Sequence, residues 1–588
     1  MEQRKEQKKE QRVYAAFGRG ARRDWKRAAR KTVFSHYWMA IMVCLVAAFL
    51  GTEFTGSLES LHFTRQKWDV ISNFLASFGR PGAAANSRGV FAIAVNKIAD
   101  GSLQNIVNNT IMSLAGSSEF WQSFGIVVSS LVSMTYWVLV THTFVVILRR
   151  LFMEMRVYEE VPPYRALYLH SARCWGRTSL ALLRVAVQRG LWWLTIIGGA
   201  IKTFSYYLCG FILAENPTMK GGDAIALSRK MMNGHKWECF LLELSFVPWH
   251  LLSLATFGLS SLFYSSAYLS AARCEFYAAV RAQVKAEGEA QALRDTYLFE
   301  KASAKTLRRA YNDLGKPAEK LPERVYGNRV TRFFGECLGV TLFVNPQDVA
   351  REKIQDREYR LRYMRRCEQG LSYPIRLSPL LQYEHKDHEP ALFTRKYPVT
   401  TLVLLFFLFS IIGWCWEVVL HLLSDGTFVN RGVLHGPWLP IYGTGGVLVL
   451  LTLYKLRDKP WLEFWATVVV CGVVEYFTAY YLETVYDRRW WDYAGYFLNL
   501  HGRICAEGLL VFGLGGMAIV YGVAPLFDNL LHKVRHSVLI GLCAALIALF
   551  CVDQAYSHFH PNEGEGITDE VVYKTDDARI RLDEEAFV

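Results

Sequence analysis

The chain alternates long apolar runs with strongly charged segments. A run of about 20 apolar residues crosses the hydrocarbon core of a bilayer as one α-helix. The pattern therefore predicts an all-α, polytopic transmembrane protein with two membrane modules of about six and five spans. Spans of the first module are expected at 33–54, at 120–148 and within 191–277, and those of the second at about 397–422, 433–454, 461–486, 504–526 and 536–552.

One apolar run, 191–217, has two interpretations. It contains Gly198-Gly199, and glycines permit a sharp bend, so the run is either one long helix or a tight hairpin that crosses twice. The loop that follows carries Arg229 and Lys230. Because basic loops stay on the cytoplasmic side, we favour the hairpin, which returns the chain to that side.

Charge divides the chain into five expected regions. The first is basic and the last acidic, and the central segment is highly charged without a run of spanning length. Basic residues beside the spans predict a cell-membrane protein with a cytoplasmic N-terminus. The expected regions are a basic tail at 1–32, a membrane domain at 33–280, a cytoplasmic linker at 281–396, a second membrane domain at 397–553 and an acidic tail at 554–588.

Composition limits the kinds of binding partner that we expect. The 588 residues are 52% hydrophobic and 20% charged, with a net charge of +13. Basic residues can bind nucleic acid, but here they flank membrane spans, so we expect the lipid bilayer as partner and no nucleic acid. The 12 cysteines occur singly, without metal-site spacing. We therefore expect no disulfide framework, no metal and no cofactor.

The candidate chemistry lies in the last third of the chain. Glu417, Glu475 and Glu507 stand within or beside apolar runs. A carboxylate at the bilayer centre costs about 2.5–3.5 kcal/mol on insertion scales, so each needs a partner, a proton or water. Arg431 and Arg503, at the ends of the same runs, are the expected partners. The candidate substrate or ion pathway comprises Glu417, Arg431, Glu475, Glu483, Asp492, Asn499, Arg503 and Glu507.

Each feature of this region has a structural alternative. The charged groups form either a proton, cation or substrate site or an ion-pair lattice that locks helices together. Glycines and prolines either break a helix to expose carbonyls for a ligand or mark an ordinary helix entry. Aromatic side chains either stack on a ligand or form an interfacial belt. The second and third groups are Gly432, Gly436, Pro437, Pro440, Tyr442 and Gly443, and Trp414, Trp490, Trp491 and Tyr493.

Two family resemblances add expectations. The stretches KTFSYYLCGFILAENP, DAIALSRKMMNGHKWECF and AYLSAARCEFY resemble the DUF975 family over about 20–280, which implies a membrane fold without assigned chemistry. The stretches GWCWEVV, FVNRGVLHGPWLPIYGTGG, VVEYFTAYYLE and WWDYAGYFLNLHGRIC resemble the CmpB-like ABC-transporter type IV permeases over about 397–530. This second resemblance implies transport by a fusion protein.

The leading functional hypothesis is therefore a transporter or permease component. The sequence has no GxxxxGK[ST] motif, so ATP-driven transport would require a separate ATPase subunit. The alternative is a non-transporting envelope scaffold, sensor or lipid-handling protein. We do not expect an enzyme, although carboxylates near the interface could act as acids or bases on a lipid-linked substrate. A homo-oligomer is compatible with either hypothesis.

Overall fold

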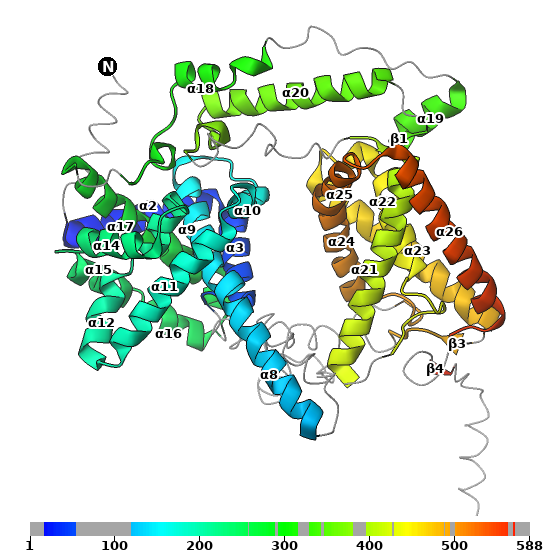
Figure 1. The fold of residues 1–588 in the computed structure, drawn as a ribbon, viewed down its shortest axis with the longest axis horizontal. Coiled ribbons are helices and arrows are strands. Elements are labelled where there is room, and N and C mark those ends of the chain that lie inside the picture. The colour runs from blue at the N-terminus through cyan, green and yellow to red at the C-terminus, as the bar shows by residue number, and fades with distance from the viewer. Residues whose placement is uncertain are drawn as a thin grey trace, which may run out of the picture. The chain divides into compact units, whose positions relative to one another are not determined.

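Helices account for almost all the regular structure in the computed structural model (Figure 1). Two short pairs of strands accompany them: β1 (Val340–Thr341) is parallel to β2 (Tyr397–Pro398), and β3 (Arg488–Arg489) is antiparallel to β4 (Asp569–Glu570). The structure describes residues 17–54, 119–256, 258–288, 292–315, 328–342, 346–379, 395–425, 429–486, 488–493, 500–562 and 569–570.

The chain divides into two compact units by its internal contacts. The first comprises the described residues within Met1–Ser87, Ala92–Glu319 and Asp356–Pro390, and the second those within Lys320–Gln355 and Ala391–Val588. The segment 281–396, expected as a linker, thus contributes residues to both units. The predicted limits of the five regions stay predictions.

The first unit is a bundle of helices of varied length. Short helices replace several of the long spans expected from hydropathy, because turns interrupt the apolar runs. Its elements are α2 (Arg19–Ser35), α3 (Tyr37–Phe49), α8 (Glu119–Tyr136), η1 (Trp137–Thr141), α9 (His142–Val157), η2 (Pro163–Leu167), α10 (Tyr168–Ser171), α11 (Trp175–Trp193), α12 (Ile196–Ser205), α13 (Cys209–Glu215), α14 (Gly221–Met231), α15 (Lys236–Leu244), α16 (Val247–Ala255), η3 (Ser261–Ser265), α17 (Ser266–Ala286), η4 (Thr296–Leu298), α18 (Ala304–Ala310), η5 (Asn312–Leu314) and η6 (Ile375–Leu377).

Helix α2, which holds many of the basic residues near the N-terminus, has one apolar face. Trp25, Ala29 and Val33 recur at intervals of four residues and are buried, which is the spacing of one apolar helix face. That face packs against α17, where the rings of Trp25 and Phe276 lie 5.6 Å apart, edge to face. Arg19, Arg23, Arg27, Arg30 and Lys31 are exposed, whereas Arg22 pairs with Glu238 at 2.6 Å and Lys26 donates to the Ser245 carbonyl at 3.2 Å. The chain then bends by 97° at the start of α3.

The run 191–217 reverses direction near its start. Helix α11 ends at Trp193, and α12 begins at Ile196 and packs back along α11 (Figure 1). The glycines follow this turn; a Cβ on Gly199 would lie 2.7 Å from the ring of Trp193, so glycine permits the close approach. The remainder, Ile196–Glu215, is one candidate span of 20 residues. The chain therefore turns before Gly198-Gly199, and the part of the run after the turn is one candidate span. The prediction that 191–217 crosses the membrane twice stays a prediction.

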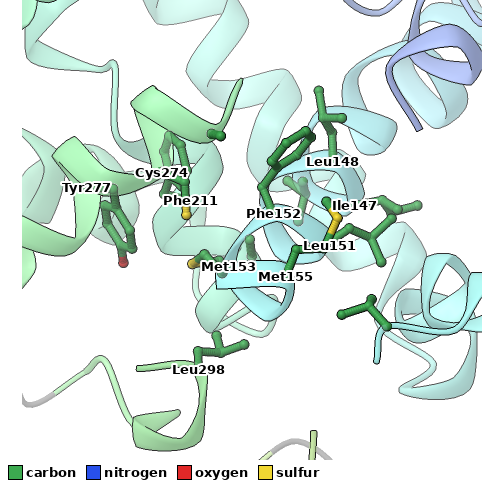
Figure 2. Close-up of a cluster of buried hydrophobic side chains, with 14 of the residues drawn as sticks. Ile147, Leu148, Leu151, Phe152, Met153, Met155, Phe211, Cys274, Tyr277 and Leu298 are labelled. Carbon is green, nitrogen blue, oxygen red and sulfur yellow. The ribbon is translucent and has the colours of Figure 1, made fainter. Parts of the chain in front are cut away.

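The core of the first unit surrounds α9. Figure 2 shows Phe152 and its neighbours from α9 together with Phe211 of α13 and Tyr277 of α17. The rings of Phe211 and Tyr277 are stacked with their centroids 4.8 Å apart. Leu298, from the segment after α17, completes this cluster (Figure 2). Residues beyond the last expected span therefore share the same core.

Buried ion pairs hold that later segment in place. Arg150 of α9 donates to Glu154 at 2.9 Å and lies 2.9 Å from Asp295, and Tyr373 donates to the same Asp295 at 2.7 Å. Arg165 donates twice to Glu154, at 2.8 and 2.5 Å. All these groups are nearly inaccessible. Because a buried charge is strongly unfavourable without its partner, the pairs fix the segment after α17 onto α9.

The second unit contains two helical hairpins and a final helix. Helices α21 and α22 form the first hairpin, and α23 and α24 form the second. Its elements are α19 (Arg329–Cys337), α21 (Val399–Asp425), α22 (Pro440–Thr452), η7 (Tyr454–Leu456), α23 (Pro460–Tyr486), α24 (Ala506–Ala518), η8 (Ile519–Val523), α25 (Ala524–Leu531) and α26 (His536–Phe559); α20 (Pro346–Glu368) has residues assigned to both units.

Within the described residues, seven helices are long and apolar enough to cross a membrane, or eight if the bent pair α2–α3 is one span. Many of their side chains face outward; only 11% of the most apolar window of His536–Phe559 is buried. Such exposed apolar surface is stable only in lipid. The chain is therefore an all-α, multi-pass membrane protein. The numbers of spans per module and the cytoplasmic N-terminus stay predictions.

Candidate functional site

The first hairpin places a carboxylate beside a tyrosine. Pro440 opens α22 in its first turn, where a missing N–H has no cost, and Tyr442 follows directly. Gly413 of α21 lies opposite; a Cβ there would be 2.3 Å from the Tyr442 ring. The ring therefore passes over Gly413 and reaches Glu417, one turn further along α21. The Tyr442 hydroxyl donates to Glu417 Oε1 at 3.0 Å.

Arg431 supplies the charge partner of Glu417. Its Nε donates to Glu417 Oε2 at 3.4 Å, and its Nη2 donates to the Trp490 carbonyl at 3.3 Å. Arg431 comes from the loop between α21 and α22, whereas Trp490 follows α23. The predicted partnership of Glu417 and Arg431 is confirmed, and the same arginine joins the two hairpins.

The second hairpin buries Glu475 with a tyrosine and no arginine. Glu475 is 4% exposed, and its Oε1 accepts a hydrogen bond of 3.0 Å from the hydroxyl of Tyr493. Its Oε2 is inaccessible and has no hydrogen-bond partner among the described residues. Burial raises the pKa of Tyr493, so the phenol stays protonated and can donate. Glu475 also lies close enough to Glu417 for their charges to interact.

The expected partner of the buried glutamates, Arg503, pairs elsewhere. Its Nη2 and Nε donate to Glu483 Oε2 at 2.8 and 2.9 Å, and its guanidinium lies 5.3 Å above the ring of Tyr476 and 5.1 Å above that of Tyr480. A planar guanidinium gains from such stacking as well as from two hydrogen bonds. This pair is therefore a separate ion-pair cluster at the end of α23.

A small hollow lies beside that pair. It is lined by Ala479, Leu482, Glu483, Trp490, Trp491 and Arg503. Both tryptophans are anchored through their ring N–H groups: Trp490 to the Asn562 carbonyl at 3.4 Å and Trp491 to the Arg503 carbonyl at 3.1 Å. Trp490 is only 5% exposed. Trp490 is therefore packed inside the protein, and Trp491 is partly buried. Whether these rings stack on a ligand or belong to an interfacial belt stays a prediction.

Glycines set the spacing of the helices at the site. A Cβ on Gly443 would lie 2.2 Å from Ser410 Oγ and 2.5 Å from the Phe406 carbonyl of α21. Small residues permit such close helix approach in membranes. In the loop before α22, Gly432 has φ +97°, a left-handed conformation that favours glycine, and a Cβ on Gly436 would meet the Trp438 ring. Gly436 and Gly443 thus permit close packing, and Pro440 lies at a helix entry. A helix break that exposes carbonyls to a ligand stays a prediction.

Sequence reasoning missed the residue that holds this loop. Asp553 of α26 accepts four hydrogen bonds: from the backbone N–H groups of His435 and Gly436 at 3.2 and 3.0 Å, from Trp438 Nε1 at 2.7 Å and from Ser557 Oγ at 3.2 Å. A carboxylate late in the final span was the available signal. Its partners in the loop, His435, Gly436 and Trp438, lie more than 100 residues away, so their identity could not be derived from spacing.

The remaining candidates have different positions. Trp414 donates to Asn430 Oδ1 at 2.7 Å and so anchors the same loop. The side chain of Asp492 is exposed. Pro437 lies in the loop before α22. Asn499 and the side chain of Glu507 lie outside the described residues.

The structure thus brings together Glu417, Arg431, Tyr442, Glu475 and Tyr493, which we call the carboxylate site.

The carboxylate site is acidic. It holds two carboxyl groups and one guanidinium, and among the described residues no Lys or Arg lies within salt-bridge distance of Glu475. An acidic, buried group in a membrane span is stable only when protonated or paired with a cation. Chemically, the site can bind a proton or a cationic group. No group of residues suited to a metal ion occurs in the described parts of the chain.

Two family models match the chain. Residues 29–284 match a family described as "Protein of unknown function (DUF975)", and residues 404–558 match one described as "Putative ABC-transporter type IV". The second match contains every residue of the carboxylate site and extends to Asp553. No curated protein and no solved structure matches the chain.

Proposed function

Because the chain joins a DUF975-type region to an ABC-transporter type IV region, we propose that it is the membrane component of a transporter. Its carboxylate site binds a proton or a cationic group during transport. The single observation that carries this proposal is the state of Glu475. It is 4% exposed within an apolar span and has one carboxyl oxygen without a described partner.

The physical argument concerns the cost of that carboxyl group. A structural role would favour full pairing, since an unsatisfied buried acceptor costs about 1–3 kcal/mol, and more when charged. Glu483, on the same helix, has such a pairing with Arg503. Glu475 lacks it among the described residues and retains the capacity to accept a proton or a cation. Groups of this kind in membrane spans commonly mark ion or substrate pathways.

The partner proposed for this component is a separate ATPase. The chain has no phosphate-binding GxxxxGK[ST] loop of its own, so a second subunit would couple ATP hydrolysis to movement in the membrane region. We further propose that the chain performs no enzymatic chemistry. Glu417 and Glu475 then bind their ligand without reacting with it.

The test uses the full-length chain purified from native membranes in mild detergent. We expect an ATPase subunit to co-purify in fixed proportion with vanadate-sensitive ATP hydrolysis. Glu475→Gln should lower that hydrolysis at least tenfold without changing assembly. Thr478→Val is the matched control, because within the described segments the Thr478 hydroxyl bonds only to the Val474 carbonyl of its own helix, at 2.7 Å. Absence of an ATPase, or equal hydrolysis in Glu475→Gln, would contradict the proposal.

A second candidate function is a non-transporting scaffold. The observation in its favour is the extent of complete pairing elsewhere, such as Arg281 with Glu215 at 2.5 and 2.8 Å inside the first unit. On that hypothesis the carboxylate site is also a helix lock. Glu475→Gln would then reduce thermal stability and the yield of folded protein, with no ATPase to affect.

A further inference from the structure

A stripe of polar residues runs along the first part of α23 (Pro460–Tyr486). Glu463, Thr467, Cys471 and Glu475 follow one another at intervals of four residues. Four residues turn a helix by about 400°, so each member lies about 40° further round than the last. With a rise of about 1.5 Å per residue, the stripe is about 18 Å long, over half the thickness of a bilayer core of about 30 Å.

The structure turns this stripe toward the other helices. Glu463 and Thr467 are 0% exposed and Glu475 is 4% exposed, whereas Val469 and Phe477 on the same helix are 65% and 62% exposed. The apolar side chains therefore face outward and the polar ones inward. A carboxyl group inside a membrane span is energetically unfavourable. Hydrophobic packing therefore does not explain why α23 buries two of them at different depths.

Glu463 resembles Glu475 in its bonding. Its Oε1 accepts a hydrogen bond of 3.0 Å from the Thr467 hydroxyl, and its Oε2 is inaccessible, with no partner among the described residues. Arg457 and Tyr521 lie nearby: Tyr521 donates to the Arg457 carbonyl at 2.9 Å, and Arg457 is close enough for its charge to act on Glu463. Tyr521 lies in the π-helical turn η8, a distortion found frequently at functional sites.

The middle of the stripe has room beside it. Cys471 faces Gly445 of α22, which is buried, yet a Cβ on Gly445 would have only Cys471 Sγ nearby, at 4.0 Å. Gly516 of α24 is different, because a Cβ there would lie 2.4 Å from the Thr467 side chain. The helices are therefore tightly packed beside Thr467 and looser beside Cys471. This looser spot lies between the two carboxyl groups.

We propose that the stripe Glu463–Thr467–Cys471–Glu475 carries protons along α23. Each carboxyl group accepts a proton from water on its unbonded oxygen and later donates that same proton to another water molecule, so one O–H bond forms for each O–H bond that breaks. Thr467 passes a proton through its hydroxyl. Cys471 keeps its S–H bond and lines the space beside Gly445, where water links Thr467 to Glu475. Successive members are about 6 Å apart along the helix axis. Two ionisable side chains lie near Glu463 at one end of the stripe: Arg457 and Tyr521. Four lie near Glu475 at the other end: Tyr493, Tyr442, Glu417 and Arg431. The inference rests on the proposed function in that Glu475 serves both.

The first test measures proton flux with the chain alone. The purified full-length protein is reconstituted into liposomes that contain a pH-sensitive dye, and a potassium diffusion potential drives proton entry. We expect flux above that of protein-free liposomes, and at least tenfold less protein-dependent flux for Glu463→Gln and for Gly445→Leu, which fills the space beside Cys471. Gly445→Ala is the matched control and should retain the flux. Flux equal to protein-free liposomes, or unchanged in both blocking variants, would overturn the proposal.

The second test needs no variant. Maleimide reacts with thiols that reach water, and peptide mapping follows each cysteine separately. The thiol of Cys471 should react with maleimide at least tenfold faster than that of Cys543, a buried cysteine of α26. Equal rates would show that water does not reach the stripe and would refute the path. Because neither test uses an ATPase, proton flux without a co-purifying ATPase would refute only the proposed function. ATPase coupling without flux would refute only the proton path.

Discussion

Two neighbouring glycines of α22 should respond oppositely to the same substitution. A Cβ at position 443 would lie 2.2 Å from Ser410 Oγ and 2.5 Å from the Phe406 carbonyl, whereas a Cβ at position 445 meets only Cys471 Sγ at 4.0 Å. Ser410 can rotate, but the Phe406 carbonyl belongs to the backbone of α21. Gly443→Ala must therefore push α21 and α22 apart, and Gly445→Ala need not move either helix.

The magnitudes follow from two opposing contributions. Overpacking of a well-packed contact costs about 1–3 kcal/mol. Alanine in place of glycine inside a helix contributes about 1 kcal/mol in the stabilising direction. Gly443→Ala should therefore lower the free energy of unfolding by up to about 2 kcal/mol, and Gly445→Ala should raise it by up to about 1 kcal/mol. Both variants carry the same added methyl group, so the difference between them reports packing.

The assay is thermal unfolding of the detergent-solubilised protein, followed by tryptophan fluorescence at one heating rate. For a unit of about 200 residues, 1 kcal/mol corresponds to about 2–4 °C in Tm. The two variants differ by the overpacking cost of about 1–3 kcal/mol, so we expect the Tm of Gly443→Ala to lie about 2–12 °C below that of Gly445→Ala. Equal midpoints would refute the reasoning, because α21 and α22 could not then be in contact through Gly443.

Two further substitutions test buried charges. Asp553→Asn removes the negative charge from an acceptor of four hydrogen bonds, so the backbone amides of His435 and Gly436 should exchange hydrogen at least tenfold faster by mass spectrometry; unchanged protection would show that another contact holds the loop. Arg281→Met leaves Glu215 buried without its partner and should lower stability by about 3–5 kcal/mol, and adding Glu215→Leu should restore most of it, since an apolar pair can replace a buried ion pair. If the double variant is no more stable than the single one, the ion pair is not the cause.

The membrane class of the protein was predictable from sequence because it depends on local composition. Whether a run such as that of α26 can cross a bilayer follows from its length and hydropathy, whatever it packs against. The pairing of Glu417 with Arg431 was also predictable, because Arg431 lies in the loop that follows the helix of Glu417, 14 residues further along the chain. The position of the turn before Gly198-Gly199 was less predictable, because glycine permits a bend without fixing where it occurs.

Tertiary structure alone decided how the carboxylate site is completed. Arg503 was an equally reasonable partner for Glu475 or Glu483, and its stacking on Tyr476 and Tyr480 determines the choice. Glu475 instead meets Tyr493, because the loop after α23 folds back over its own helix. Such pairings depend on the rotation of each helix about its axis and on the course of its loops. Neither is encoded in the period or length of an apolar run, so only the packed structure fixes which polar groups meet.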